Sequence, residues 1–300
     1  MGKKTALLVT IAILLLVAGL LYWKRGHAGP GMAARPGNAV APVPAASPER
    51  GAGNAQPGTP AVAPAMASSA KKGGAPAGAG FTLRAGETLE FAANVTKLNS
   101  TIANLKVVTA ERRNFYGKNS WHLQAFAHTE NPYRMVFELD DQFDSYSAAG
   151  DLASLQYEMH LNERGEKVDL VQRMVSAPQE AAPADASAAR VPAGTRDPLG
   201  LLQYLRGVDW SKTPEIKSAV YDGRKFYEAH AVVVGQGAAV QVPAGKYTAS
   251  KIEIRVYENG TEMKDAHFLL YLSADAARLP VLLEAVLPVA TARVELNSAK

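Results

Sequence analysis

The stretch from Lys251 to Leu272, KIEIRVYENGTEMKDAHFLLYL, decides the fold. Its first half alternates apolar and charged side chains, which puts Ile252, Ile254 and Val256 on one face of an extended chain. Asn259-Gly260 follows, and this dipeptide favours the tight turn of a two-residue β-hairpin. Apolar alternation resumes after the turn. The stretch therefore predicts two antiparallel strands with one buried face.

The same alternation extends outward from this hairpin in both directions. Turn sequences such as Asn162-Glu163-Arg164-Gly165 and Asp222-Gly223 separate the alternating segments. The other expected strands are Thr88–Leu98, Ile102–Ala110, Ser120–His128, Tyr133–Leu139, Leu155–Leu161, Val168–Met174, Ile216–Val220, Lys225–Val234, Val281–Val286 and Thr291–Asn297. A sheet of about a dozen twisted strands is expected to curl or close. The predicted class is all-β, a curled antiparallel sheet or a partly open β-barrel or roll.

One short helix is expected within this β body. Asp197 can cap its amino terminus, and Pro198 suits the first helical position. Leu199, Leu202 and Leu205 then share one face. The leucine spacing predicts that the helix packs on the sheet.

The amino-terminal segment predicts a membrane anchor over residues 1–25. Thr5–Trp23 holds 19 consecutive uncharged residues, which as a helix would span about 28 Å of a bilayer core of about 30 Å. The run exceeds the usual apolar region of a cleaved signal peptide, and it ends in Tyr22-Trp23-Lys24-Arg25, an interfacial pattern. Small residues near Ala28 leave cleavage open as the alternative. Flanking charges do not decide the orientation.

Residues 26–80 predict a disordered linker to a β domain over 81–300. Nine of the 18 prolines lie in this segment, which contains no Phe, Trp, Tyr, Leu or Ile. Such a composition cannot bury enough apolar surface to offset the entropy lost on ordering. A second Ala- and Pro-rich stretch, 176–195, is expected to be a low-complexity insertion within the β domain.

Composition excludes several functional classes. The chain has no cysteine, so it has no disulfide, thiolate metal site or cysteine nucleophile. Residues 1–80 carry a net charge of +7 and the rest of the chain carries −3. Nucleic-acid binding needs a basic stripe on the folded part. The charge distribution therefore argues against a nucleic-acid partner.

Catalytic and metal-binding signatures are not found in the sequence. His122 and His128 share a strand face, but six residues separate them by about 20 Å at ~3.4 Å per residue. Asp140 and Asp141 point to opposite faces of a strand. We expect no catalytic residue, no metal ligand and no cofactor. Arg206 and Arg278 are candidate buried partners of Asp141 or Asp144.

Aromatic residues concentrate in the first half of the β domain. They suit either the core or the lining of an apolar groove that binds a lipid or a lipidated partner. The groove candidates are Trp121, Phe126, Tyr133, Phe137, Phe143, Tyr146 and Tyr157.

Five ordered stretches resemble a known bacterial family. They are Gly86–Phe91, Phe143–Tyr146, Asp197–Arg206, Val242–Glu253 and Leu272–Val281. Together they resemble the family catalogued as domain of unknown function 3108, over roughly 85–300. The resemblance implies an exported, mostly antiparallel β protein of the cell envelope. It therefore favours an anchor that places the β domain in the periplasm.

The family resemblance implies no catalytic residue, because the family has no established activity. A structural role is expected for the residues that carry the resemblance, which are Asp197, Pro198, Leu205, Arg206, Pro243, Gly245, Arg278 and Pro280. We expect a non-enzymatic β domain, anchored in the bacterial inner membrane, that binds a lipid or a lipidated partner. An envelope scaffold that binds another protein is the alternative, and an enzyme acting on cell-wall glycans is the third.

Overall fold

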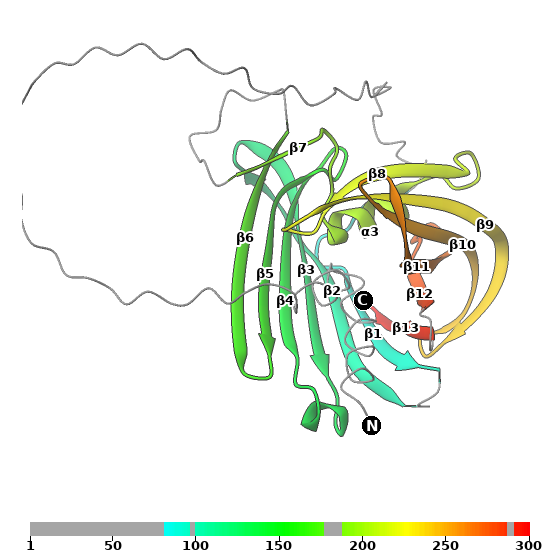
Figure 1. The fold of residues 1–300 in the computed structure, drawn as a ribbon. Coiled ribbons are helices and arrows are strands. Elements are labelled where there is room, and N and C mark those ends of the chain that lie inside the picture. The colour runs from blue at the N-terminus through cyan, green and yellow to red at the C-terminus, as the bar shows by residue number, and fades with distance from the viewer. Residues whose placement is uncertain (1–80, 97–99, 177–187, 287–290) are drawn as a thin grey trace, which may run out of the picture.

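The computed structural model describes residues 81–96, 100–176, 188–286 and 291–300, which form one curled sheet with a short helix inside it (Figure 1). The expected anchor Thr5–Trp23 and the linker 26–80 lie outside the described residues. Among the residues that are described, no helix has the length and apolarity needed to cross a bilayer. The strands are β1 (Thr88–Val95), β2 (Thr101–Phe115), β3 (Lys118–Thr129), β4 (Asp140–Ala148), β5 (Ser154–Glu163), β6 (Glu166–Ser176), β7 (Ala189–Val191), β8 (Glu215–Tyr221), β9 (Phe226–Val242), β10 (Gly245–Glu258), β11 (Thr261–Ser273), β12 (Pro280–Val286) and β13 (Thr291–Ala299).

The sheet is built from two meanders that meet at its centre. Its strand order is β7-β6-β5-β4-β3-β2-β1-β13-β12-β11-β10-β9-β8. The chain therefore starts in the middle, runs to one edge, crosses to the other edge and returns to pair β13 with β1. Neighbouring strands are antiparallel except β6 and β7, which are parallel. The predicted antiparallel all-β class is confirmed.

The hairpin that predicted the fold forms β10 and β11. Glu258 pairs with Thr261 across Asn259 and Gly260, whose φ angles are 51° and 76°. Positive φ at both central residues is the conformation that a tight hairpin turn requires. Ile252 and Ile254 are buried, as their alternation predicts.

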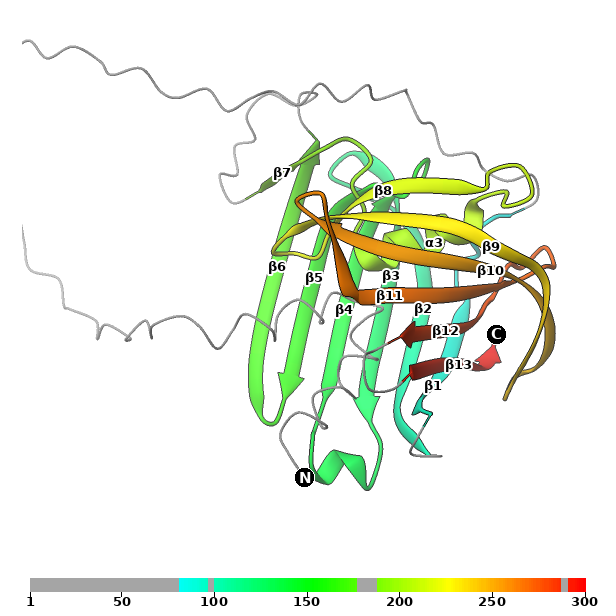
Figure 2. The same cartoon turned by 45° about the vertical axis from the view of Figure 1, so that its right-hand side comes forward.

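The sheet is curled, and its two halves cross each other. The twist between neighbouring strands accumulates across a sheet and produces such a crossing. In Figure 2, strands β2–β6 run at a steep angle to strands β8–β11, and the helix α3 (Pro198–Gly207) lies between the two halves. Leu199, Leu202 and Leu205 are buried at this position. They join the inward-facing side chains of both halves in one hydrophobic core.

Two residues connect β5 to the edge strand β8. The carbonyl of Thr195 accepts a hydrogen bond of 2.9 Å from the amide of Ser154 on β5. The next residue, Arg196, donates from its amide to Ala219 and accepts from Tyr221 on β8, at 3.0 and 2.9 Å. This parallel bridge closes the roll at the end where α3 begins.

One expected strand is wrong and one expected insertion is partly structured. Residues Tyr133–Met135 form a short 3-10 turn, and β4 begins only at Asp140. Arg134 holds this turn through Glu138 and Asp140. Of the stretch 176–195, the final part forms β7 and the turn before Arg196, while residues 177–187 lie outside the description.

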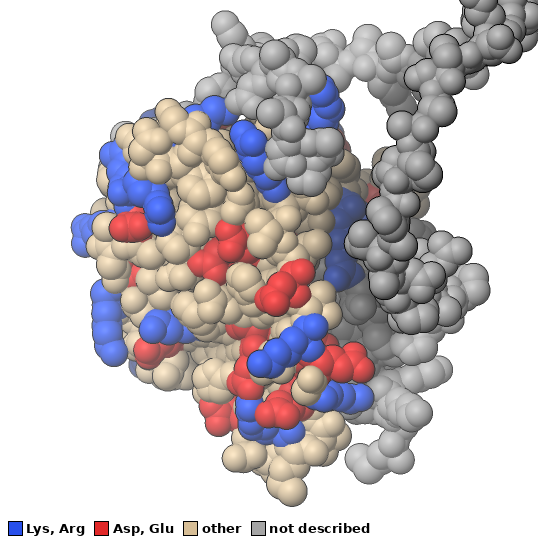
Figure 3. Space-filling view, turned by 90° about the vertical axis from the view of Figure 1, so that its left-hand side faces the viewer, with Lys and Arg blue, Asp and Glu red and all other residues tan. Residues whose placement is uncertain are grey.

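Charges are mixed on the outer surface near β6. Figure 3 shows Lys and Arg interspersed with Asp and Glu on this face. This face therefore carries no basic stripe of the kind that binds nucleic acid.

Candidate functional site

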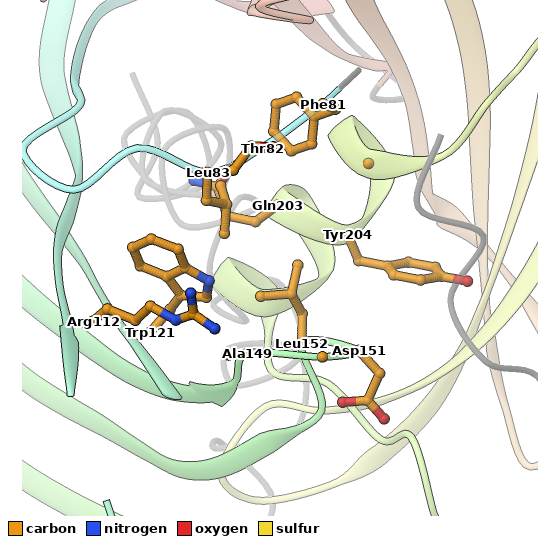
Figure 4. A pocket seen from close by; sticks show the side chains of 12 residues that line it. Phe81, Thr82, Leu83, Arg112, Trp121, Ala149, Asp151, Leu152, Gln203 and Tyr204 are labelled. Carbon is orange, nitrogen blue, oxygen red and sulfur yellow. The ribbon is translucent and has the colours of Figure 1, made fainter. Parts of the chain in front are cut away.

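A pocket of about 190 Å³ opens beside α3, at the end of the roll that the Thr195–Arg196 bridge closes (Figure 4). Its walls come from the segment before β1, from β2 and β3, from the β4–β5 connection and from α3. The lining residues are Phe81, Thr82, Leu83, Arg112, Trp121, Ala149, Gly150, Asp151, Leu152, Gln203, Tyr204 and Gly207. The site thus combines four parts of the chain that are distant in sequence.

The amino terminus of α3 is fixed by a buried carboxylate. Asp197 is fully buried and accepts a hydrogen bond of 2.8 Å from the amide of Gly200 through Oδ1. Its Oδ2 accepts from the hydroxyls of Ser145 and Ser154. Burial raises the pKa of Asp197, and these hydrogen bonds oppose that rise. Asp197 therefore caps the helix, as predicted, and also ties it to β4 and β5.

The carboxyl end of α3 is fixed by Arg206. Its guanidinium is buried and forms two hydrogen bonds, of 2.6 and 2.8 Å, with the carboxylate of Glu87. It also donates to Gln203 Oε1 at 2.7 Å and to the carbonyls of Ala277 and Arg278 at 3.1 Å. Arg206 thereby positions Gln203 against the pocket.

The expected partners of the two family arginines are wrong. Arg206 pairs with Glu87, not with Asp141 or Asp144. Arg278 donates to backbone carbonyls at the end of α3, at 2.8 Å to Val208. The last carbonyls of a helix have no partner within the helix, which explains why a cation lies there.

Arg196 lies behind the pocket lining, where it contacts Asp151 and Tyr204. Its guanidinium donates to the carbonyl of Asp151 at 2.7 and 3.1 Å and to Ser218 Oγ at 3.0 Å. It also stacks over the Tyr204 ring, 3.5 Å from the ring centroid. Burial lowers the pKa of Arg196. The side chain therefore links the β4–β5 connection, α3 and β8.

Arg112 differs from the other arginines of the site. Its guanidinium lies 5.6 Å from the Trp121 ring centroid, and Figure 4 shows it beside the indole. No hydrogen bond or ion pair connects this guanidinium to another of the described residues. A bulge between Thr109 and Glu111 brings Arg112 opposite Trp121 and onto the inner face of the sheet. The pocket thus combines apolar and polar side chains, with one exposed cationic residue, Arg112, and one acidic residue, Asp151, that no ion pair joins to it.

The seven aromatic candidates do not share one surface. Trp121 lines the pocket. Phe143 and Tyr157 are buried in the core, with ring centroids 6.5 Å apart. Phe126 points to the outer face of the sheet, where Lys106 lies over its ring. Tyr146 is also on the outer face and stacks on His122. Tyr133 and Phe137 lie in the β3–β4 connection.

The remaining family residues occupy structural positions. Pro198 is the first residue of α3, and Leu205 is buried on its inner side. Pro243 lies in the β9–β10 turn, where Gly245 has a φ of 140°. Pro280 begins β12.

The histidines of β3 have separate carboxylate partners. His122 Nε2 bonds Asp144 at 2.7 Å, and His128 Nε2 bonds Glu130 at 3.0 Å. As expected from their spacing, the two do not converge.

Sequence reasoning did not identify most of the pocket. Arg112, Gln203 and Tyr204 were not candidates, because no local pattern relates β2 to α3. One available signal was the break in alternation at Glu111-Arg112-Arg113, where three charged residues end an alternating strand.

Three solved structures are similar to this chain at low sequence identity. A β-barrel-like protein of domain of unknown function DUF1849 from Brucella abortus is 11% identical, with a TM-score of 0.46, and the match covers 73% of this chain and 99% of that one. A protein from Parabacteroides distasonis proposed to be a lipoprotein is 11% identical, with a TM-score of 0.35 and coverage of 73% and 97%. A protein from Bacteroides fragilis proposed to be exported, with a YmcC-like fold, is 9% identical, with a TM-score of 0.34 and coverage of 73% and 98%.

No curated protein matches the sequence significantly. A family model, however, matches residues 90–297, which span the sheet from β1 to β13. This agrees with the resemblance of the ordered stretches from Gly86 to Val281. The chain belongs to the family described as protein of unknown function DUF3108.

Proposed function

We propose that this protein is a non-catalytic binding domain of the bacterial cell envelope. Its ligand is an amphipathic anion, such as the end of a lipid or of a lipidated partner, held in the pocket beside α3. The observation that carries this proposal is the Arg112 guanidinium, which lies over Trp121 at the pocket and forms no ion pair with the described residues, including the pocket's Asp151.

The pocket contains the two features that such a ligand needs. Phe81, Leu83, Trp121 and Leu152 provide apolar contact. Arg112 provides a charged donor that can bond two oxygens of a carboxylate or phosphate at once. Binding sites of this kind are mostly apolar with a few polar groups that fix the orientation.

The size of the pocket limits how much of the ligand enters. A volume of about 190 Å³ corresponds to roughly six water molecules at ~30 Å³ each. It is slightly larger than an engineered cavity of about 150 Å³ that accepts benzene. Leucines of α3 and inward-facing side chains of the sheet form the hydrophobic core next to the pocket. The pocket therefore takes a ring or a short aliphatic segment, and the remainder of the ligand stays outside.

The test compares octanoate with octanol as probes for the full chain in nanodiscs, using isothermal titration calorimetry. We expect octanoate to bind at least tenfold more tightly, and we expect Arg112→Gln to remove this preference. Arg113→Gln is the matched control, because Arg113 is adjacent but pairs with Glu111 outside the pocket. Equal affinity for the two probes, or a preference that survives Arg112→Gln, would refute the proposal. Native mass spectrometry of the purified full chain then identifies any lipid that copurifies.

The proposed location is the periplasmic side of the inner membrane, with Thr5–Trp23 as a single-pass anchor. Support comes from the length of that apolar run and its interfacial Tyr22-Trp23-Lys24-Arg25 ending. A carboxyl-terminal alkaline phosphatase fusion is expected to be active. An inactive fusion that is stably produced would exclude this orientation.

A second candidate function is protein binding through the β3–β4 connection. At its tip, Met135 is 85% exposed and Val136 is 69% exposed. Adjacent exposed apolar side chains are typical of contact surfaces when they form a patch. A photo-crosslinking residue at Met135 is expected to give a discrete adduct in cells. The control is the same residue at the exposed Val234 of β9, which is expected not to give that adduct. The same adduct from both positions would remove this candidate.

A further inference from the structure

A cluster of side chains that could hold a metal ion lies on the outer face of β4–β6, away from the pocket. It contains Asp144, Glu158 and His160, whose ligating atoms all lie within 4.8 Å of one another. Asp144 and Glu158 are directly opposite each other across β4 and β5. Two like charges in that position repel each other unless a cation lies between them. Figure 3 shows acidic side chains near the middle of the face around β6.

The imidazole of His160 is oriented by a carboxylate behind it. Its Nδ1 bonds Asp169 Oδ1 on β6 at 2.7 Å, and the two residues are directly paired across the strands. A neutral imidazole that donates from Nδ1 leaves the lone pair of Nε2 available. That Nε2 faces Glu158 Oε2 at 3.5 Å, which is longer than an N–H···O hydrogen bond of about 2.7–3.2 Å.

The carboxylate of Asp144 is also held in place. Oδ1 accepts from His122 at 2.7 Å and from Gln124 at 2.8 Å, and Oδ2 accepts from Gln142 at 2.8 Å. A carboxylate oxygen has two lone pairs, so Oδ2 keeps one acceptor position. The side chain is only 5% exposed. Three hydrogen bonds therefore hold this buried carboxylate in place.

Glu158 is the third candidate metal ligand of the cluster. Gln156 donates to its Oε1 at 2.5 Å, so its Oε2 is the oxygen that faces His160. Ligands at about 2.0–2.2 Å from a tetrahedral Zn²⁺ are separated by roughly 3.3–3.5 Å. The separation of 3.5 Å between Glu158 Oε2 and His160 Nε2 matches that geometry, and the Asp144 oxygen lies within 4.8 Å of both.

We propose that Asp144, Glu158 and His160 form a divalent transition-metal site of the zinc class. One nitrogen and two oxygens bind the metal, and water completes the coordination. Asp169 positions His160, as a carboxylate behind a ligating histidine commonly does. The site lies on a rigid part of the sheet, and it does not depend on the anion pocket or its ligand.

The test is calorimetric titration of Zn²⁺ into the full chain in detergent after chelator treatment. We expect one equivalent to bind and His160→Gln and Glu158→Gln each to weaken binding at least tenfold. Asp169→Asn is expected to weaken it about tenfold, the range seen for residues that orient a metal ligand. His128→Gln is the matched control, because His128 also pairs with a carboxylate on the outer sheet face but lies outside the cluster.

Two further measurements make the outcome decisive. Thermal melts identify any variant that has lost its fold, and nitrogen-detected NMR of the histidines reports whether Zn²⁺ shifts Nε2 of His160. Retention of full Zn²⁺ affinity in both His160→Gln and Glu158→Gln would overturn the proposal. So would equal affinity for Ca²⁺, which would indicate only a general acidic surface.

Discussion

Replacing Glu87 with glutamine is expected to lower the free energy of unfolding by about 3–5 kcal/mol, the usual cost of removing one partner of a buried ion pair. Arg206 is 1% exposed, and both of its bonds to Glu87 are short, at 2.6 and 2.8 Å. Glutamine keeps the size of the side chain but removes the counter-charge. The guanidinium then stays buried with neutral partners only, which are the amide oxygen of the new side chain, Gln203, two carbonyls and the Phe81 ring.

The expected loss corresponds to a fall in Tm of roughly 6–20 °C, at ~2–4 °C per kcal/mol for a domain of this size. Urea unfolding followed by circular dichroism measures the free energy directly. The control is Glu111→Gln, which breaks an exposed pair with Arg113 and should cost less than about 1 kcal/mol. A change below about 1 kcal/mol in Glu87→Gln would refute the reasoning.

Two further predictions concern a buried acid and a tightly packed glycine. Burial raises the pKa of Asp141 to about 7 from 3.8, so the folded state holds this proton more tightly than the unfolded chain. The free energy of unfolding is therefore expected to fall as pH rises from about 4 to 7, by as much as roughly 4 kcal/mol at ~1.36 kcal/mol per pKa unit. Urea unfolding measured across that pH range tests this, and Asp141→Asn should flatten the slope of the free energy against pH. An equal slope in the variant would contradict the prediction. Gly200→Ala should lower stability by roughly 1–3 kcal/mol, because its Cβ would meet Ser147 Oγ at 2.9 Å. Gly150→Ala, with nothing within 4 Å, is the control, and an equal Tm for the two variants would contradict the packing argument.

Local patterns predicted the elements well where one face of a strand is buried. The alternation in β10 and the Asn259-Gly260 turn placed a hairpin correctly, because side chains of a strand alternate regardless of which strand lies beside it. Asp197 and Pro198 placed the start of α3 for a similar reason, since a cap depends on residues within one turn.

Local patterns failed at Tyr133–Leu139. Its aromatic and β-branched residues suit a strand, but residues 133–135 form a turn and Met135 is exposed. Ion pairs of Arg134 to Glu138 and Asp140 stabilise the turn. Propensity is a weak indicator for a strand when no partner strand is available to pair with it.

The sequence by itself determined the all-β class, the hairpins, the capped helix and the family, because each depends on residues close together or on an ordered set of motifs. Only the tertiary structure decided that β1 lies in the middle of the sheet and that Thr195 and Arg196 connect β5 to the edge strand β8. It also decided that Arg206 binds Glu87 and that Arg112 reaches the pocket beside α3. Curvature and long-range pairing bring these residues together, and neither leaves a periodic trace along the chain.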